Sequence, residues 1–198
     1  GAYPELEKIK QEFQEGLDNS RFSSEAMKEK FEKSGTKILD GYYPYFSSLP
    51  VNSVAEVEYK FDGVQVGDYS VMGKIDRIEK LSGGTFGLYD YKTGTPVSEA
   101  KVAPNQPKEN YFNQLCFYKY AFEKATGKKV SQVGLIYVEN HAKNVYKNLQ
   151  EEDMEYIENL IKSTYEKINN FEFDPIKEDK NGECKNCAYK HLCRLDLI

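Results

Sequence analysis

The spacing of hydrophobic and polar positions changes its period along the chain. In residues 5–17 and 24–47, apolar side chains recur every three or four positions, which predicts two amphipathic helices. In residues 54–61, apolar and polar side chains alternate instead, as expected for a half-buried strand. The dipeptide Asp62-Gly63 then predicts a turn. The pattern therefore indicates a change from helical to strand structure near residue 50.

The rest of the chain alternates between expected strands and helices. Two strand-like runs are joined by the hairpin signal Ser82-Gly83-Gly84, and a loop that contains glycine and several prolines follows them. The expected strands are 69–81, 85–91, 132–139 and 143–149, the expected helices are 110–125 and 151–170, and the expected loop is 93–109. This order predicts a mixed α/β fold with a central β-sheet flanked by helices.

A length of 198 residues suits one domain with a sizeable core. We divide it into a helical N-terminal part (1–50), a catalytic core (51–150), a helix and loop (151–183) and a cysteine-rich tail (184–198). No run approaches 18 apolar residues, so no membrane contact is expected. The first residues show no export signal, and a cytoplasmic location is the expectation.

Composition narrows the class of function. The 16 Tyr and 11 Phe supply the apolar mass that disordered chains lack. A net charge of -5 argues against a protein that coats nucleic acid through a basic surface. It does not exclude a nuclease, because carboxylates that bind metal are acidic.

The candidate chemistry lies in the second expected hairpin. Side chains alternate along a strand, so Asp90 and Lys92 share a face at about 6.5–7 Å. If the two strands pair, Asp76 can meet Asp90 across them. Neighbouring carboxylates repel each other, and a divalent cation such as Mg²⁺ or Mn²⁺ removes that cost. Such an ion would activate a water and neutralise charge on a phosphodiester, while the lysine stabilises the nucleophile.

Two alternatives stay open at this point. An Asp and a Lys two positions apart on a strand are also typical of an ordinary surface ion pair. Glu56 and Glu58 share one face of the preceding strand, and either could add a metal ligand. Of these two acids we favour Glu56.

Three segments resemble motifs of one nuclease family. Residues 73–78 read Gly-Lys-Ile-Asp-Arg-Ile, residues 90–94 read Asp-Tyr-Lys-Thr-Gly, and residues 114–118 read Gln-Leu-Cys-Phe-Tyr. In this order they resemble the RecB/AddB-type branch of the PD-(D/E)xK nucleases, and the resemblance covers residues 54–193. It implies a restriction-endonuclease-like core. It also implies that Asp76, Asp90 and the Tyr91 carbonyl hold the metal, that Lys92 is catalytic, and that Gln114 and Tyr118 line the site and help to place DNA.

A cysteine cluster lies near the end of the chain. Cys184, Cys187 and Cys193 have the spacing C-x2-C-x5-C, which is typical of soft-metal ligands in a reducing compartment. The spacing resembles that of AddB-like and CRISPR-adaptation nucleases, where a fourth, upstream cysteine completes an iron–sulfur cluster. Here no cysteine precedes Cys116, which we interpret as a small buried residue. An iron–sulfur cluster in the intact protein, a zinc site completed by His191, and an incomplete site stay open.

The leading hypothesis is a Mg²⁺- or Mn²⁺-dependent deoxyribonuclease. The resemblance implies an exonuclease that acts on DNA delivered by a helicase domain or subunit. RecB-type nucleases carry a histidine before the first strand, whereas His141 and His191 both follow the lysine motif. We therefore expect a C-terminal piece of a helicase–nuclease or a divergent stand-alone nuclease. The alternatives are a catalytically impaired DNA-binding scaffold of the same fold, and a CRISPR- or restriction-associated nuclease.

Overall fold

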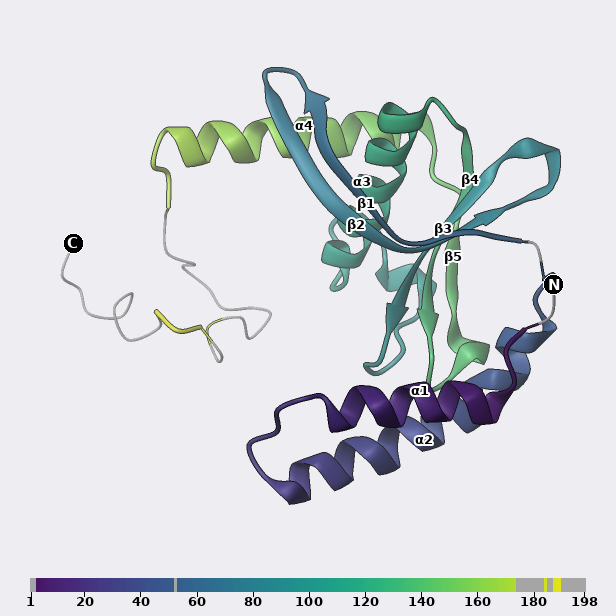
Figure 1. Ribbon diagram of the computed structural model, residues 1–198. Coiled ribbons are helices and arrows are strands. Elements are labelled where there is room, and N and C mark those ends of the chain that lie inside the picture. The colour runs from purple at the N-terminus through teal and green to yellow at the C-terminus, as the bar shows by residue number, and fades with distance from the viewer. Residues whose placement is uncertain (1–2, 52, 174–183, 185–186, 190–198) are drawn as a thin grey trace.

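The computed structural model describes residues 3–51, 53–173, 184 and 187–189. Over these residues the chain folds into a five-stranded sheet with helices on both sides (Figure 1). The helices are α1 (Leu6–Asp18), α2 (Glu25–Ser48), α3 (Glu109–Thr126) and α4 (Glu151–Asn169), and the strands are β1 (Val54–Val66), β2 (Tyr69–Lys80), β3 (Phe86–Lys92), β4 (Val130–Tyr137) and β5 (Val145–Lys147). The expected mixed α/β fold is confirmed.

The strands lie in chain order, β1-β2-β3-β4-β5. All neighbours are antiparallel except β3 and β4, which run parallel. A parallel pair needs a crossover connection, and α3 supplies it. The crossover places α3 against the strands that carry the candidate site.

The helices form layers on opposite sides of the sheet. In Figure 1, α3 and α4 lie on one side, and α1 and α2 lie on the other as an antiparallel pair. Tyr42 of α2 meets the ring of Tyr91 in β3, and the hydroxyls of Tyr45 and Tyr146 lie 3.1 Å apart. These aromatic contacts attach the α1–α2 pair to the sheet.

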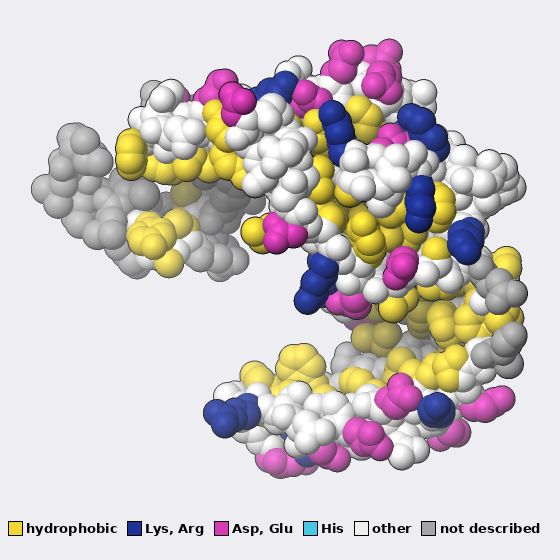
Figure 2. Space-filling model, turned by 45° about the horizontal axis from the view of Figure 1, so that its top comes forward, with side chains coloured by type: hydrophobic (Ala, Val, Ile, Leu, Met, Phe, Trp, Pro, Cys, Tyr) yellow, Lys and Arg dark blue, Asp and Glu magenta, His cyan; other side chains and the backbone are white. Residues whose placement is uncertain are grey.

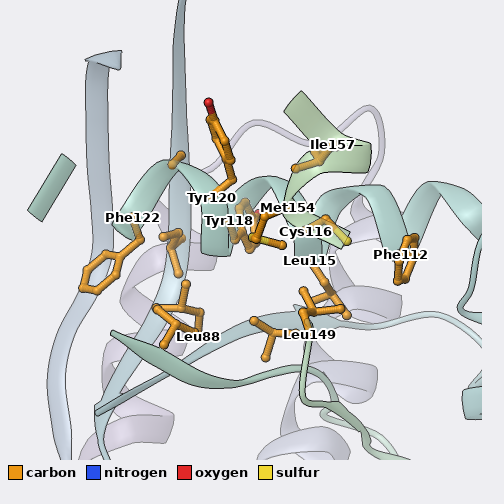
Figure 3. Packing of buried hydrophobic residues seen from close by; sticks show 14 of the residues in the cluster. Leu88, Phe112, Leu115, Cys116, Tyr118, Tyr120, Phe122, Leu149, Met154 and Ile157 are labelled. Atoms are coloured by element: carbon orange, nitrogen blue, oxygen red, sulfur yellow. The ribbon is translucent and has the colours of Figure 1, made fainter. Parts of the chain in front are cut away.

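The core fills the layer between the sheet and α3 with α4. Leu88 of β3, Leu115 of α3 and Leu135 of β4 are fully buried, and Met154 and Ile157 of α4 close the layer (Figure 3). Each buried aliphatic side chain of this size contributes about 1.5–3 kcal/mol to folding. The strand that carries Asp90 and Lys92 is therefore held on a rigid support.

Figure 2 shows that the α1–α2 pair projects from the body of the molecule. Hydrophobic side chains line its inner side, and α2 exposes Met27 and Phe31. No helix among the residues described above combines the length and the apolar character needed to cross a membrane.

The prediction of a turn at Asp62-Gly63 is wrong. β1 continues to Val66, and the chain reverses at residues 67–68. The pairing with β2 shifts by one position between Phe61 and Val64, and Gly63 has a φ of 68°. An extra residue in one strand is a β-bulge, and glycine accepts the positive φ without strain. The strand expected at 143–149 is also shorter than predicted, since β5 spans Val145–Lys147.

The hairpin connection predicted at Ser82-Gly83-Gly84 joins β2 to β3, and it forms a short 3₁₀ turn, Ser82–Gly84. Gly83 and Gly84 both have positive φ values, 71° and 74°. A side chain at either position would be strained, so these two glycines allow the reversal.

Candidate active site

The ladder between β2 and β3 ends at the two candidate acids. The strands pair from Lys80 and Phe86 to Arg77 and Tyr89, and the next opposing positions are those of Asp76 and Asp90. There the backbone N–H of Tyr91 donates to the Asp76 Oδ2 atom, at 2.8 Å. The N–H and C=O of one strand residue point to the same neighbouring strand, so the Tyr91 carbonyl also faces β2. A carboxylate thus takes the place of a backbone acceptor at the end of this ladder.

Asp90 lies at the centre of a hydrogen-bond network between β3 and α3. Its side chain is buried, with 5% exposure. Its Oδ1 atom accepts from Gln114 Nε2 at 2.9 Å and from the Tyr118 hydroxyl at 3.1 Å. Gln114 Nε2 also donates to the Tyr118 oxygen at 2.9 Å, and Gln114 Oε1 accepts from Lys92 Nζ at 2.9 Å. One glutamine therefore orients both the acid and the lysine.

The second oxygen of Asp90 has a different environment. Lys92 Nζ lies 2.6 Å from Asp90 Oδ2, but the geometry is not that of a hydrogen bond. No other described residue donates to this buried atom. We interpret the contact with Lys92 as electrostatic. Lys92 therefore compensates the charge on this oxygen, and the atom has room in its coordination only for a partner that supplies no hydrogen bond, such as a cation.

The electrostatics of Asp76 also favour a cation. Partial burial raises the pKa of the Asp76 carboxyl above its ordinary value, and the charges of Asp90 and Glu58 raise it further. The Tyr91 N–H and the Lys74 ammonium act in the opposite direction. Asp76 and Asp90 are therefore close enough to repel each other, as expected from the sequence. A divalent cation between them would relieve this repulsion.

The donor set fits a hard cation such as Mg²⁺. Two carboxylates, Asp76 and Asp90, and the Tyr91 carbonyl could hold it, with water at the other positions. No three His, Cys, Asp or Glu side chains form a metal-binding group within the described ranges. A metal here would consequently depend on the two carboxylates, the backbone and water.

Glu58, and not Glu56, interacts with Asp76. Glu56 is exposed and pairs with Ile78, whereas the charge of Glu58 contributes to the raised pKa of Asp76. Glu58 also accepts a short hydrogen bond from Lys74 Nζ. Its φ of 52° departs from strand geometry, so the alternation that placed Glu56 and Glu58 on one face does not hold at this residue. The Glu56 ligand stays an untested prediction.

Arg77 was not singled out from the sequence, yet it lies directly behind the acids. It is 2% exposed, on the face of the sheet that meets α2. Its guanidinium lies 4.9 Å from the Tyr89 ring centroid and 5.3 Å from that of Tyr91, and it donates to the Tyr42 and Tyr91 hydroxyls. Glu79 Oε1 lies 3.3 Å from Arg77 Nε as an ion pair without hydrogen-bond geometry. Strand alternation could have located this cluster in the sequence. Side chains alternate between the two faces, so those of Arg77, Tyr89 and Tyr91 lie on the face opposite Asp76 and Asp90.

The cysteines divide into two groups. Cys116 is fully buried in the core, and burial raises the pKa of its thiol to about 12, so its interpretation as a small buried residue is confirmed. Cys184 and Cys187 lie within the described residues, where the Cys187 N–H donates to the Cys184 carbonyl at 3.4 Å. Cys193 and His191 lie outside the described residues, so the metal cluster stays a prediction.

His141 does not belong to the site. It is exposed, and its ring stacks on Tyr45 at 5.0 Å between centroids. This agrees with its interpretation as an ordinary loop residue.

Two solved structures are similar to this chain. The chain is similar to SSO0001, with a TM-score of 0.49, 18% identity, and coverage of 98% of this chain and 96% of that one. It is also similar to a protein from Eubacterium rectale named "Putative exonuclease", with a TM-score of 0.50, 12% identity, and coverage of 100% and 77%. No curated protein matches the chain.

The sequence of the chain identifies its family. The model of the PD-(D/E)XK nuclease superfamily matches residues 2–194, a span that includes Asp76, Asp90 and Lys92. The structure brings these three side chains together where the ladder between β2 and β3 ends. The chain belongs to the PD-(D/E)XK nuclease superfamily.

Proposed function

We propose that this protein is a Mg²⁺- or Mn²⁺-dependent deoxyribonuclease that hydrolyses phosphodiester bonds at Asp76, Asp90 and Lys92. The observation that carries the proposal is the environment of Asp90. Its carboxylate is buried, forms an ion pair with Lys92 at 2.6 Å, and is close enough to Asp76 to raise the pKa of that acid. A folded protein keeps such a repulsive arrangement where function needs it.

The residues of the chain have separate tasks in this proposal. A bound divalent cation would supply Lewis acidity toward the phosphate and lower the pKa of a water. Lys92 would stabilise negative charge at the reacting phosphate, because its ammonium is already held by Gln114 and lies 4.7 Å from the Tyr111 ring centroid. Gln114 and Tyr118 would keep Asp90 oriented, in addition to the DNA contact expected from the sequence.

The finer parts of the proposal rest on the motif resemblance. These are exonucleolytic cleavage, a helicase domain or subunit as partner, and an iron–sulfur cluster or zinc at Cys184, Cys187 and Cys193. Metal and sulfide analysis after anaerobic purification tests the cysteines, with iron and sulfide, zinc, or neither as the outcomes.

The test of the main proposal compares linear and circular DNA, single- and double-stranded, with Mg²⁺, Mn²⁺ or EDTA. We expect cleavage that EDTA abolishes, and Asp90→Asn and Lys92→Met should each reduce it by about 100-fold or more. Asp62→Asn and Lys80→Met, which change exposed residues outside the site, should retain it. Cleavage that persists in both site variants sinks the assignment. Circular substrates that are cut as fast as linear ones refute the exonuclease assignment alone.

A catalytically impaired scaffold is the second candidate. The position of both histidines after the lysine motif supports it. DNA binding without cleavage under every metal condition would favour this candidate over the nuclease.

A further inference from the structure

An open groove of about 650 Å³ leads away from the candidate site between β2 and α3. It is lined by Gly73, Lys74, Lys92, Asn110, Tyr111 and Gln114, among others. Lys92 and Gln114 belong to both the groove and the network around Asp90. A chain that occupied this groove would therefore reach the acids directly.

Tyr111 is the aromatic residue in the groove whose ring faces two ammonium groups. Lys92 Nζ lies 4.7 Å and Lys108 Nζ 5.5 Å from the Tyr111 ring centroid. The ring is half-buried, so part of it remains accessible. Lys92 also pairs with Asp90, but Lys108 forms no ion pair with any residue that the structure describes. An uncompensated ammonium beside a partly exposed aromatic ring is a combination suited to an anionic, aromatic ligand.

Every nucleotide of a nucleic acid combines an anionic phosphate with an aromatic base. A base stacks on an aromatic side chain, and the neighbouring phosphate pairs with lysine, with little dependence on sequence. The amides of Asn110 and Gln114 add polar groups along the same side of α3. Cavities of several hundred cubic ångströms hold small ligands, so the groove has room for a short piece of single strand.

We infer that this groove is a nucleotide subsite next to the scissile phosphate, in which a base stacks on Tyr111 and a flanking phosphate contacts Lys108. The inference rests on the proposed nuclease function and deepens it by naming the form of the substrate. Asp90 is 5% exposed and the side chain of Lys92 is 19% exposed, so the reacting phosphate must enter the groove. A single strand has unpaired bases that can stack on Tyr111, whereas the bases of an intact duplex are already stacked on one another.

The structure offers a matched control on the same helix. Lys124 Nζ lies 5.4 Å from the Tyr120 ring centroid, which repeats the contact between Lys108 and Tyr111. Tyr111 lines the groove and Lys108 lies beside it against the Tyr111 ring, whereas neither Lys124 nor Tyr120 lines the groove. Lys124→Gln therefore removes the same charge and the same cation–π contact without touching the subsite.

The experiment measures binding of a fluorescent oligodeoxythymidylate to the full chain in Ca²⁺, at several salt concentrations. Tyr111→Leu should weaken binding by about tenfold, as expected for one lost stacked base, and Tyr111→Phe should retain wild-type affinity. Lys108→Gln should reduce the slope of log Kd against log salt by about 0.7, the value for one phosphate contact on a single strand. Lys124→Gln should leave the slope unchanged.

Cleavage kinetics of a single strand separate this inference from the main proposal. The subsite requires Tyr111→Leu to raise KM while kcat is retained. A fall in kcat alone would mean that Tyr111 acts only through Lys92, and the subsite would be overturned. Wild-type affinity and slope in both Tyr111→Leu and Lys108→Gln, with cleavage intact, overturn the subsite and leave the nuclease. If the wild-type chain neither binds nor cuts DNA, both fail. Circular dichroism shows whether each variant is folded. If Tyr111→Leu does not fold, the salt dependence of Lys108→Gln decides whether the subsite exists.

Discussion

The Arg77 guanidinium and the Tyr91 side chain meet on the face of the sheet opposite the acids. Arg77 donates to the Tyr91 hydroxyl at 3.1 Å, while the backbone N–H of the same tyrosine donates to Asp76 on the other side of the site. Tyr91 is thus fixed from both directions. Arg77 is thus linked through Tyr91 to the Asp76 carboxylate, with which it forms no hydrogen bond.

We therefore expect Arg77→Gln to act on both stability and activity. The change leaves Glu79 buried without its cation, and breaking such a pair costs about 3–5 kcal/mol. Urea unfolding measures this loss. If Arg77 positions Tyr91, the folded variant should need a higher concentration of metal for half-maximal cleavage than the wild type does. The measurement is made without urea and well below the Tm of the variant. An unchanged metal requirement in the folded variant would restrict Arg77 to a structural role.

Asp76→Asn should stabilise the protein while it abolishes cleavage. The pKa of Asp76 is raised in the folded state, mainly by burial, so the folded protein binds this proton more tightly than the unfolded chain. The contribution of this group to stability therefore falls as pH rises from about 4 through the raised pKa. An asparagine accepts the Tyr91 N–H without that cost. In metal-free buffer at pH 7, the Tm of Asp76→Asn should exceed that of the wild type.

Added Mg²⁺ or Mn²⁺ gives the complementary result. A cation that binds only the folded state raises its Tm. We expect a Tm increase for the wild type and little or none for Asp76→Asn. Equal metal-induced shifts in the two proteins would place the binding site elsewhere.

Gln114→Leu should reduce cleavage by about 10- to 100-fold, the usual effect of losing a group that orients a metal ligand. The change removes the donor to Asp90 and the acceptor for Lys92 together. Tyr118→Phe removes one donor to the same Asp90 oxygen, and its effect should be smaller. Steady-state kinetics at saturating metal measure both. The reverse order of effects would contradict the central role given to Gln114.

Gly73→Ala should destabilise the fold through a steric clash. A Cβ at this position would collide with the Phe61 ring on the paired strand. Overpacking of this kind costs about 1–3 kcal/mol. Phe61→Leu in the same chain should recover part of the loss, as measured by urea unfolding. If the double variant loses at least as much stability as the two single changes added together, the clash with Phe61 is not the cause.

The sequence predicted the elements better than the contacts. Periodicity located the helices and strands because side chains near a core must follow the geometry of their element. It failed at Asp62-Gly63, where a bulge and a turn have the same local signal, and at Glu58, where a positive φ interrupts the alternation. The approach of Gln114 to Asp90 followed from the motif resemblance. The tyrosines that surround Arg77 include Tyr42 of α2. No local sequence pattern specifies where α2 lies against the sheet, so this contact could not be predicted.

The 3₁₀ turn at Ser82–Gly84 joins two strands whose register decides where the acids lie. Strand side chains have a period of two, so a slide of β3 along β2 by one step would exchange the two faces of β3. Asp90 would lose its place opposite Asp76, and an aromatic ring from the other face would arrive there instead. The buried Leu88 and the pairing of β3 with β4 oppose such a slide. The apolar packing of the core therefore also protects the chemistry of the acids, because Leu88 and Asp90 lie on the same face of β3.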